Sequence, residues 1–336
     1  MRIIAKAPCR VDLAGGTLDI WPLYLYHPGS VTVNFAVDLY AGCSLSTRRD
    51  KRIVLRSLDL DTQEAFPSLE ALRASKSYRL PLHAHLLHFF SPRTGLTIET
   101  TSEAPAGAGL AGSSTLIIAL ATALSKITGA HYGKERLRAI AQDIEAQIIR
   151  VPTGCQDYYP ALYGGVSAIE LAPGAIRRIG ISVDPDELNA RVVLVYTGEP
   201  RRSGINNWAV TQAHIGGDRR VHRNFDQIAA IARAMRSALE GADWAEAGRL
   251  LREEWDHRRR NAPGITTPLI DALVAKARRR GAMGAKVCGA GGGGCVVFLV
   301  ERGAQSSVAA SAESLGAKVI PARLAPHGVR VRAVPQ

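Results

Sequence analysis

A short stretch rich in glycine and hydroxyl side chains could bind a phosphate group. It runs from Pro105 to Thr115 and contains Gly107, Gly109, Gly112, Ser113 and Ser114. Glycine tolerates positive φ angles, which lets several backbone N–H groups point at one ligand. The apolar run from Leu116 to Leu124 predicts a helix directly after it, with Ser113 or Ser114 as N-cap. Because a helix N-terminus attracts anions, we expect this loop to hold the phosphates of a nucleotide.

The same glycines also fit the dinucleotide-binding pattern G-x-G-x-x-G. An oxidoreductase that binds a flavin or nicotinamide dinucleotide at Gly107–Gly112 is therefore the alternative from another enzyme class. That pattern requires a buried apolar strand before the first glycine and an acidic residue ending a second strand about 20 residues later. Here residues 96–103 are alternating and polar, Pro105 interrupts them, and a second helical pattern follows Gly133. This context favours a phosphate loop of another kind.

A second glycine-rich loop extends from Gly289 to Gly294, between Lys286 and an apolar run over 295–300. The run after the loop predicts a strand, so the context of a dinucleotide site is missing here too. A hairpin turn would need only one or two glycines. We therefore expect a loop whose backbone approaches a ligand closely.

Two carboxylates are placed where they could take part in catalysis. The periodicity of residues 134–150 predicts an amphipathic helix with Ala141 on its buried stripe. Glu145 lies about 40° from Ala141 around that helix, so it borders the buried stripe. A carboxylate in that position needs a partner, because burying it alone is costly. Asp157 follows in a non-helical elbow that contains Gly154.

The composition is that of an ordinary globular protein of 336 residues, 46% hydrophobic and 21% charged, which is long enough for two domains. The net charge is +12, but the basic clusters are short and carry few aromatic residues, so we expect solvated helix faces and no nucleic-acid partner. These clusters are Arg48, Arg49, Lys51 and Arg52; Arg201 and Arg202; Arg258, Arg259 and Arg260; and Arg278, Arg279 and Arg280.

Cysteine usage and the chain start suggest a cellular location. Five cysteines without a C-x-x-C pair predict reduced thiols and a cytoplasmic protein. The first residues lack the apolar core of a signal peptide. The uncharged run over 105–124 begins with glycine and serine, so we expect no membrane span.

The elements that would position these groups follow from hydrophobic patterning and turn residues. Strands are expected over 2–15, 31–37, 40–47, 53–57, 191–196 and 295–300. Helical spacing covers 68–91, 116–124, 134–150, 224–239 and 244–255, and a helix from Pro268 is bracketed by Thr267 and Gly281. Residues 171–188, rich in Pro, Gly and charge, are expected to cross between two domains.

Three motifs together resemble the GHMP kinases, the superfamily of galactokinase, homoserine kinase, mevalonate kinase and phosphomevalonate kinase. They are Pro8 to Asp19, Pro105 to Ser114, and Lys286 to Cys295, in the order of that family. The chain has no G-x-x-x-x-G-K-[ST] motif of P-loop enzymes and no H-R-D or D-F-G motif of protein kinases. The resemblance implies a two-domain α/β (α+β) fold. Residues 1–185 would resemble the second domain of ribosomal protein S5, and residues 186–336 would be ferredoxin-like.

The resemblance also implies roles for individual residues. Asp157 would be the catalytic base, or the charge that orients the acceptor hydroxyl, and Arg10 would hold it ionised and stabilise the transferring phosphoryl group. Glu145 would hold Mg²⁺ together with a serine of the loop. Counting forward from Gly109 gives Ser113, which we assign, and counting back from the helix gives Ser114. ATP would lie over Pro105, Gly107, Ala108, Gly109, Leu110, Ala111, Gly112, Ser113 and Ser114, and the substrate site would be formed by Gly16, Thr17, Asp19, Gly154, Asp157, Gly291 and Gly292.

The acceptor substrate is expected to be a sugar or a sugar phosphate. Residues 153–159, 196–198 and 250–255 are similar to the sugar-kinase branch that includes heptose 7-phosphate kinases. That branch usually has A-G-G-G-T-D where this chain has residues 14–19, A-G-G-T-L-D, and often a glutamine where this chain has Tyr158. Both differences lie where the substrate should bind. The alternatives on this fold are a kinase for another sugar, a kinase for an alcohol such as mevalonate, and a non-catalytic sugar or nucleotide sensor. A homodimer is the oligomeric state that we consider.

Overall fold

The computed structural model describes residues 1–200 and 203–334, so the basic pair Arg201 and Arg202 lies outside the described residues. The strands are β1 (Arg2–Ala14), β2 (Val31–Thr47), β3 (Ile53–Ser57), β4 (Thr62–Phe66), β5 (Leu96–Ser102), β6 (Val166–Ala172), β7 (Ala175–Ile181), β8 (Val192–Tyr196), β9 (Ala282–Val287), β10 (Cys295–Val300), β11 (Lys318–Ile320) and β12 (Arg330–Val334). The helices are η1 (Leu23–Tyr26), α1 (Leu69–Ala74), α2 (Pro81–Phe90), α3 (Gly112–Thr128), α4 (Lys134–Ile149), α5 (Tyr158–Tyr163), α6 (Pro185–Asn189), α7 (Ser203–Ile215), α8 (Arg219–Glu240), α9 (Trp244–Arg258), α10 (Pro268–Arg278) and α11 (Gln305–Glu313).

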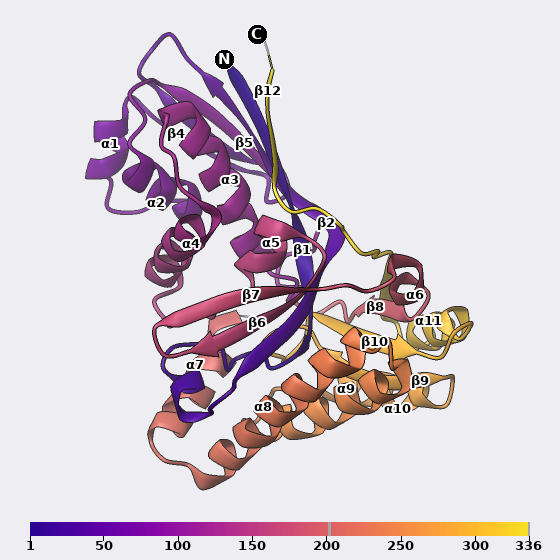
Figure 1. Cartoon of the computed structure of the whole chain (residues 1–336). Helices are drawn as coiled ribbons and strands as arrows, with labels where there is room; N and C mark the ends of the chain where they lie inside the picture. Colours follow the sequence, from indigo (N-terminus) through magenta and orange to yellow (C-terminus); the bar gives the residue numbers. More distant parts are fainter. Residues whose placement is uncertain (201–202, 335–336) are drawn as a thin grey trace.

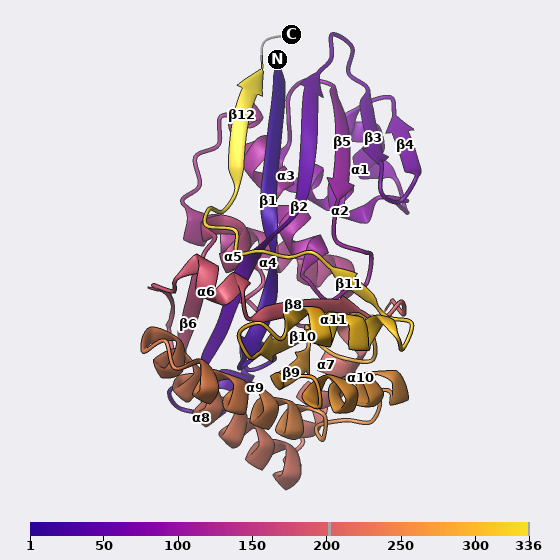
Figure 2. The same ribbon diagram turned by 90° about the vertical axis from the view of Figure 1, so that its right-hand side faces the viewer.

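The larger sheet of the described chain runs in the order β12-β1-β2-β5-β3-β4, with β6 paired to β2 and β7 to β6 (Figure 2). All neighbouring strands are antiparallel except β3 and β5. Helix α3 packs against β1 and β2, and α2 and α4 pack against α3 (Figure 1). The predicted run from Leu116 to Leu124 is apolar on all sides because it lies between this sheet and those two helices.

Two segments differ from the local patterns of the sequence. The strands expected over 31–37 and 40–47 form one strand, β2, because a bulge at residues 38 and 39 keeps both parts paired with β1. The helical spacing over 68–91 splits into α1 and α2, since Ser68 caps the first helix and Pro81 begins the second.

The segment 171–188, expected to be an inter-domain crossing, contains most of a hairpin. Strand β7 pairs antiparallel with β6 around a turn at Pro173 and Gly174, and Gly174 has a φ of 72°. Proline and glycine mark this turn and not a linker. The chain then passes through the short helix α6 to β8.

The smaller sheet has the order β11-β8-β10-β9 and is antiparallel throughout. Counted along the chain, its strands lie in the order fourth, first, third, second, which is the ferredoxin-like arrangement. Helix α9, with α8 packed on it, covers one face of this sheet, and helices α10 and α11 cover the other. Helix α8 also contacts β1 and β2, and α9 contacts β1, so these helices join the two sheets.

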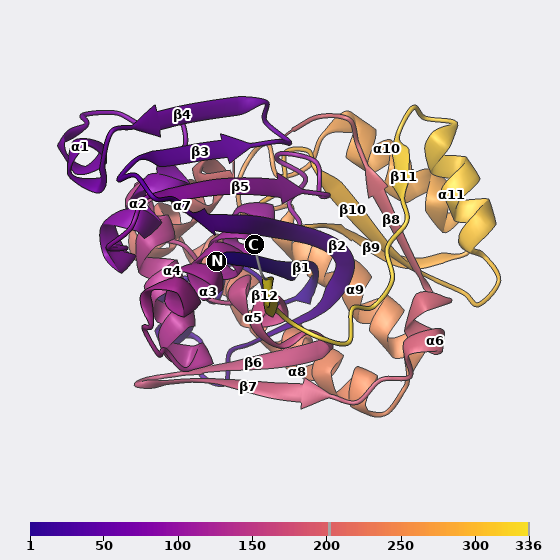
Figure 3. The same ribbon diagram turned by 90° about the horizontal axis from the view of Figure 1, so that it is seen from above.

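The last strand returns to the first sheet. Strand β12 pairs with β1 from Arg2↔Val334 to Lys6↔Arg330, so the end of β12 lies beside the start of β1 (Figure 3). The division at residues 185 and 186 remains a prediction, but this pairing places the end of the second half in the sheet of the first. In the described residues, no helix is both long and apolar enough to span a bilayer.

Candidate functional site

A cavity of about 470 Å³ is lined by residues from both halves of the chain. It brings together most of the residues that the sequence singled out. The shared lining residues are Arg10, Gly16, Thr17, Asp19, Pro105, Gly107, Ala108, Gly109, Leu110, Ala111, Gly112, Ser113, Ser114, Glu145, Gly154 and Asp157. Segments that lie more than 100 residues apart in the sequence therefore line the same cavity.

Arg10 of β1 links the elbow acid to the phosphate loop. Its Nε donates a hydrogen bond to Oδ1 of Asp157 at 2.8 Å, and its Nη2 lies 2.8 Å from the same oxygen. Its Nη1 donates to the carbonyl oxygen of Gly109 at 2.6 Å. Burial alone would lower the pKa of Arg10, but Asp157 and Asp12 raise it above its usual value, so the guanidinium stays charged. Both Arg10 contacts to Asp157 are made through Oδ1.

Glu145 of α4 lines the cavity and accepts hydrogen bonds from two hydroxyl groups. Ser114 Oγ and Tyr158 OH each donate a hydrogen bond to its Oε2 at 2.7 Å. Burial raises the pKa of Glu145, and these hydrogen bonds oppose that rise. Ser114 is buried and Ser113 is exposed, and both line the cavity. A carboxylate and hydroxyl oxygens are the hard donors that suit Mg²⁺, so this corner fits the metal.

The phosphate loop is held by backbone contacts. Gly107, Gly109 and Ala111 have φ angles of 70°, 81° and 62°. Ala111 is the N-cap of α3, which corrects the expectation of a serine cap; Ser113 and Ser114 lie within the first turn. Gly112, Ser113 and Ser114 of that turn line the cavity. The N–H groups of a first helical turn have no intrahelical partner, so they are available to an anion.

The second glycine-rich loop packs against the first. Cys295 N donates to the carbonyl oxygen of Ala108 at 2.7 Å, and a Cβ on Gly294 would lie 2.7 Å from the same oxygen. Gly289 and Ala290 line the cavity. Gly291 and Gly292 lie against Ile265, whose carbonyl oxygen accepts a hydrogen bond from Gly292 N. Their assignment to the substrate wall remains a prediction.

One end of the cavity is crowded with polar groups around Asp19. Gln156 N donates to Asp19 Oδ2 at 2.8 Å, and a Cβ on Gly154 would lie 2.0 Å from that oxygen, so only glycine fits there. Burial, reinforced by the charge of Asp157, raises the pKa of Asp19 to about 7. Thr17 Oγ1 lies 3.3 Å from Asn207 Oδ1 of α7. Gln156, Asn207 and Arg258 also line the cavity, although the sequence analysis gave them no site role.

Comparison with known proteins identifies the family. The GHMP kinase N-terminal domain matches residues 75–165, and the GHMP kinase C-terminal domain matches residues 235–318. The chain belongs to the GHMP kinase family. It is a phosphotransferase whose acceptor is an alcohol group.

Named relatives and solved structures agree with this family. The D-glycero-alpha-D-manno-heptose 7-phosphate kinase of Campylobacter jejuni is 26% identical over 313 residues, which cover 89% of each chain. The mevalonate kinase of Thermococcus sibiricus is 23% identical over 362 residues and covers 100% of both. The structure of a D-glycero-D-manno-heptose 1-phosphate kinase from Bacteriodes thetaiotaomicron has a TM-score of 0.79 at 23% identity, covering 99% of this chain and 100% of that one.

The oxidoreductase alternative is wrong for this GHMP kinase. The loop at Gly107–Gly112 follows β5, which lies in a mostly antiparallel sheet, where it pairs antiparallel with β2 and parallel with β3. A dinucleotide-binding turn follows a buried strand of a parallel sheet. The glycines therefore belong to the kinase motif.

A buried ion network behind the substrate end of the kinase was missed from the sequence. Lys286 of β9 places Nζ 2.5 Å from Asp12 Oδ2 and 3.7 Å from Glu254 Oε1. Burial opposes ionisation of Asp12, but Lys286, Arg258 and Arg10 lower its pKa. Arg258 donates from Nε to Glu254 Oε1 at 2.9 Å and from Nη2 to the carbonyl oxygen of Gly16 at 2.7 Å.

This network corrects the view of the 258–260 cluster as a solvated helix face, because Arg258 is buried. Two local signals could have shown it. One is a lysine in the otherwise uncharged segment that forms β9, and the other is the i,i+4 spacing of Glu254 and Arg258.

Proposed function

We propose that this kinase transfers the γ-phosphate of ATP to a hydroxyl of a sugar or sugar phosphate, with a heptose 7-phosphate-type sugar as the acceptor. The observation that carries the proposal is the position of Arg10, which contacts Asp157 and the carbonyl of Gly109 with one guanidinium. An acid, a cation and a phosphate loop thereby meet at one point of the cavity.

Asp157 is the group that receives the proton in this proposal. Its Oδ2 would accept the proton of the sugar hydroxyl as the new O–P bond forms and the bond from the γ-phosphorus to the bridging oxygen of ATP breaks, which releases ADP. Its Oδ1 would stay hydrogen-bonded to Arg10. The charged guanidinium of Arg10 holds the Asp157 side chain through Oδ1 and leaves Oδ2 for the acceptor hydroxyl. The same charge, placed near Gly109, would stabilise negative charge on the transferring phosphoryl group.

ATP and Mg²⁺ would occupy the other end of the cavity. The first turn of α3 would hold the phosphates through its N–H groups. Glu145 and a serine, either Ser113 or Ser114, would hold Mg²⁺, which neutralises phosphate charge when it is bound. Leu60 and Leu82 line the cavity and offer an apolar surface for the nucleotide base.

The polar end of the cavity supports a polyhydroxylated acceptor. Thr17, Asp19, Gln156 and Asn207 supply hydroxyl, carboxyl and amide groups that pair with sugar hydroxyls. The relative named as a heptose 7-phosphate kinase supports the same choice.

The test is ADP release from ATP–Mg²⁺ with a panel of acceptors, comparing kcat/KM. We expect D-glycero-D-manno-heptose 7-phosphate to exceed galactose and mevalonate by at least about tenfold, a difference of about 1.4 kcal/mol in transition-state binding. A higher value for mevalonate would overturn the sugar assignment. Binding of sugar and ATP without turnover by any acceptor would instead indicate a sensor.

A further inference from the structure

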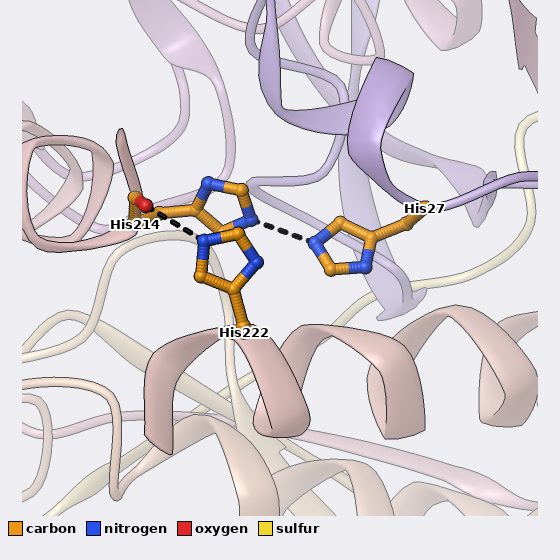
Figure 4. Close-up of side chains that lie close together, drawn as sticks. All are labelled: His27, His214 and His222. Atoms are coloured by element: carbon orange, nitrogen blue, oxygen red, sulfur yellow. Dashed lines mark hydrogen bonds between the residues drawn. The ribbon is translucent and has the colours of Figure 1, made fainter. Parts of the chain in front are cut away.

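Three histidines from distant parts of the chain meet outside the kinase cavity. His27 follows η1, His214 lies near the end of α7, and His222 lies in the first turns of α8. Figure 4 shows the rings of His214 and His222 side by side, stacked with centroids 3.8 Å apart, and the ring of His27 meeting them at one edge. One nitrogen of each ring lies within 4.8 Å of the others. His27 and His214 are buried, and His222 is half-buried.

The hydrogen bonds around the rings decide which nitrogen of each faces the centre. His27 Nδ1 lies 2.7 Å from Asp226 Oδ1 and donates its proton to that carboxylate, which leaves a lone pair on Nε2. His222 Nε2 donates to the carbonyl oxygen of His214 at 2.8 Å, which leaves the lone pair on Nδ1. His214 Nε2 lies 2.7 Å from His27 Nε2, which places it in the same space.

These hydrogen bonds leave one buried ring nitrogen of the cluster without a partner among the described residues. Buried His214 Nδ1 has no hydrogen-bond partner there. Aromatic rings hold the cluster in place: Phe225 stacks on His27 with centroids 5.8 Å apart, and Tyr26 lies 5.4 Å from His214. Rings fixed in this way lose little freedom when they bind a ligand.

We propose that His27 Nε2, His214 Nε2 and His222 Nδ1 bind one transition-metal ion, of which Zn²⁺ is the best match. Three imidazoles are an established zinc ligand set, with Zn–N distances of about 2.0–2.1 Å. Tetrahedral ligands at that distance lie about 3.3 Å apart, so the 2.7 Å between His27 and His214 needs a small outward ring movement. The half-buried His222 ring, which is stacked on His214, would turn to direct Nδ1 at the same ion. A solvent molecule on the half-buried side of His222 supplies the fourth ligand.

The groups behind the ligands fit this assignment. Asp226 accepts from His27 Nδ1 as the carboxylate does in a carboxylate–histidine–zinc triad. The carbonyl of His214 holds His222 in the same manner through Nε2. All five cysteines are buried elsewhere, so the donor set contains nitrogen and no sulfur, in contrast to the oxygen donors at Glu145.

The ion would join three segments that meet near the acceptor end of the cavity. The segment between β1 and β2 carries both Thr17 and His27, and α7 carries both Asn207 and His214. Bound metal would therefore fix α7 relative to the acceptor-binding loop, far along the chain from the Mg²⁺ ligands.

Metal content tests the proposal without any use of turnover. Tag-free protein is loaded with Zn²⁺, dialysed against metal-free buffer and analysed by inductively coupled plasma mass spectrometry. We expect one Zn²⁺ per chain for the wild type and for the matched control His88→Gln, a half-buried helical histidine beside His85. The ion should be lost from His222→Gln. Wild-type protein without zinc, or His222→Gln that retains it, would overturn the proposal.

A second variant leaves all three ligands in place. Asp226 is exposed, and Asp226→Asn should weaken Zn²⁺ affinity by about 10–100-fold in a competition titration. Co²⁺ bound to wild-type protein should give the visible absorption of a four-coordinate ion without a thiolate charge-transfer band. An unchanged affinity of Asp226→Asn, or a thiolate band, would contradict the assignment. Neither readout depends on the acceptor substrate, so the kinase proposal stands or falls separately.

Discussion

Asp157 owes its position to Arg10, which has only 3% of its side chain exposed and anchors on the backbone of Gly109. Asp157 itself is 25% exposed, so its free oxygen can reach a substrate. The division of labour is typical of phosphoryl transfer, in which positioning and charge matter more than covalent chemistry. Replacing Asp157 should therefore affect turnover more than nucleotide binding.

Asp157→Asn should lower kcat by about 10²–10⁴-fold, because the amide keeps the shape of the carboxylate and cannot accept the proton. The dissociation constant for ATP–Mg²⁺ should change little, since Asp157 is not part of the phosphate loop. ADP release gives the first value and isothermal titration calorimetry the second. Turnover close to that of the wild type would exclude Asp157 as the base.

Asp19 should make stability depend on pH. Its folded-state pKa is about 7 against a usual value of 3.8, so the folded chain keeps a proton that the unfolded chain has already released. Between about pH 4 and pH 7 its contribution to the free energy of unfolding should therefore fall as pH rises, by up to about 1.4 kcal/mol per unit.

Asp19→Asn isolates this effect because the amide does not titrate. The difference in urea-unfolding free energy, variant minus wild type, should increase from pH 4 to pH 7 and level off above it. A difference that stays constant across that range would show that Asp19 is ionised in the folded protein throughout.

At the scale of the elements, β9 and α9 carry the charges that sit behind the acceptor end. Lys286 on β9 contacts Asp12 on β1 and Glu254 on α9, and all three side chains are fully buried. One lysine therefore connects the smaller sheet, the larger sheet and a helix. Its removal would leave buried carboxylates without their cation, which is more damaging than losing the pair together.

Lys286→Met should destabilise the protein by about 3–5 kcal/mol. Urea unfolding measures the change. Lys318→Met is the matched control, because Lys318 is an exposed lysine on β11 of the same sheet, and its effect should stay within about 0.5 kcal/mol. Equal effects of the two substitutions would mean that Lys286 has no special electrostatic role.

Local patterns predicted the elements that local interactions determine. The apolar run after Gly112 became α3, and Thr267 and Pro268 begin α10 as expected. Glycine-rich motifs likewise indicated the loop that leads to α3 and ends at Ala111. Glu145 was placed beside a buried stripe from its helical spacing alone. In each case the decisive residues lie within a few turns of one another.

Long-range contacts explain what the sequence left out. Asp12 and Lys286 are 274 residues apart, and His27 and His214 are 187 apart, so no spacing rule connects them. The bulge in β2 depends on pairing with β1, and the position of Gly291 depends on Ile265. The residue types and motifs in the sequence were enough to name candidate site residues. Their long-range contacts could be identified only from the tertiary structure.

At the scale of the whole molecule, the cavity exists only where the two halves of the chain meet. The loop at Gly107 is held by Cys295 from the smaller sheet, and Gly16 is held by Arg258 from α9. Helices α8 and α9 contact the larger sheet on the same side of the junction. Neither half alone would therefore present the complete set of lining groups.

Strand β12 has a protective consequence for the strand that bears Arg10. It forms hydrogen bonds with the outer N–H and C=O groups of β1 from Arg2 to Lys6. Without β12, this part of β1 would be an exposed edge strand, and its open margin could pair with another chain. A chain truncated after Val329 should self-associate through that margin, whereas removal of residues 335 and 336 alone should not. Size-exclusion chromatography with light scattering distinguishes the two, and a monodisperse truncated chain would show that β1 resists intermolecular pairing unaided.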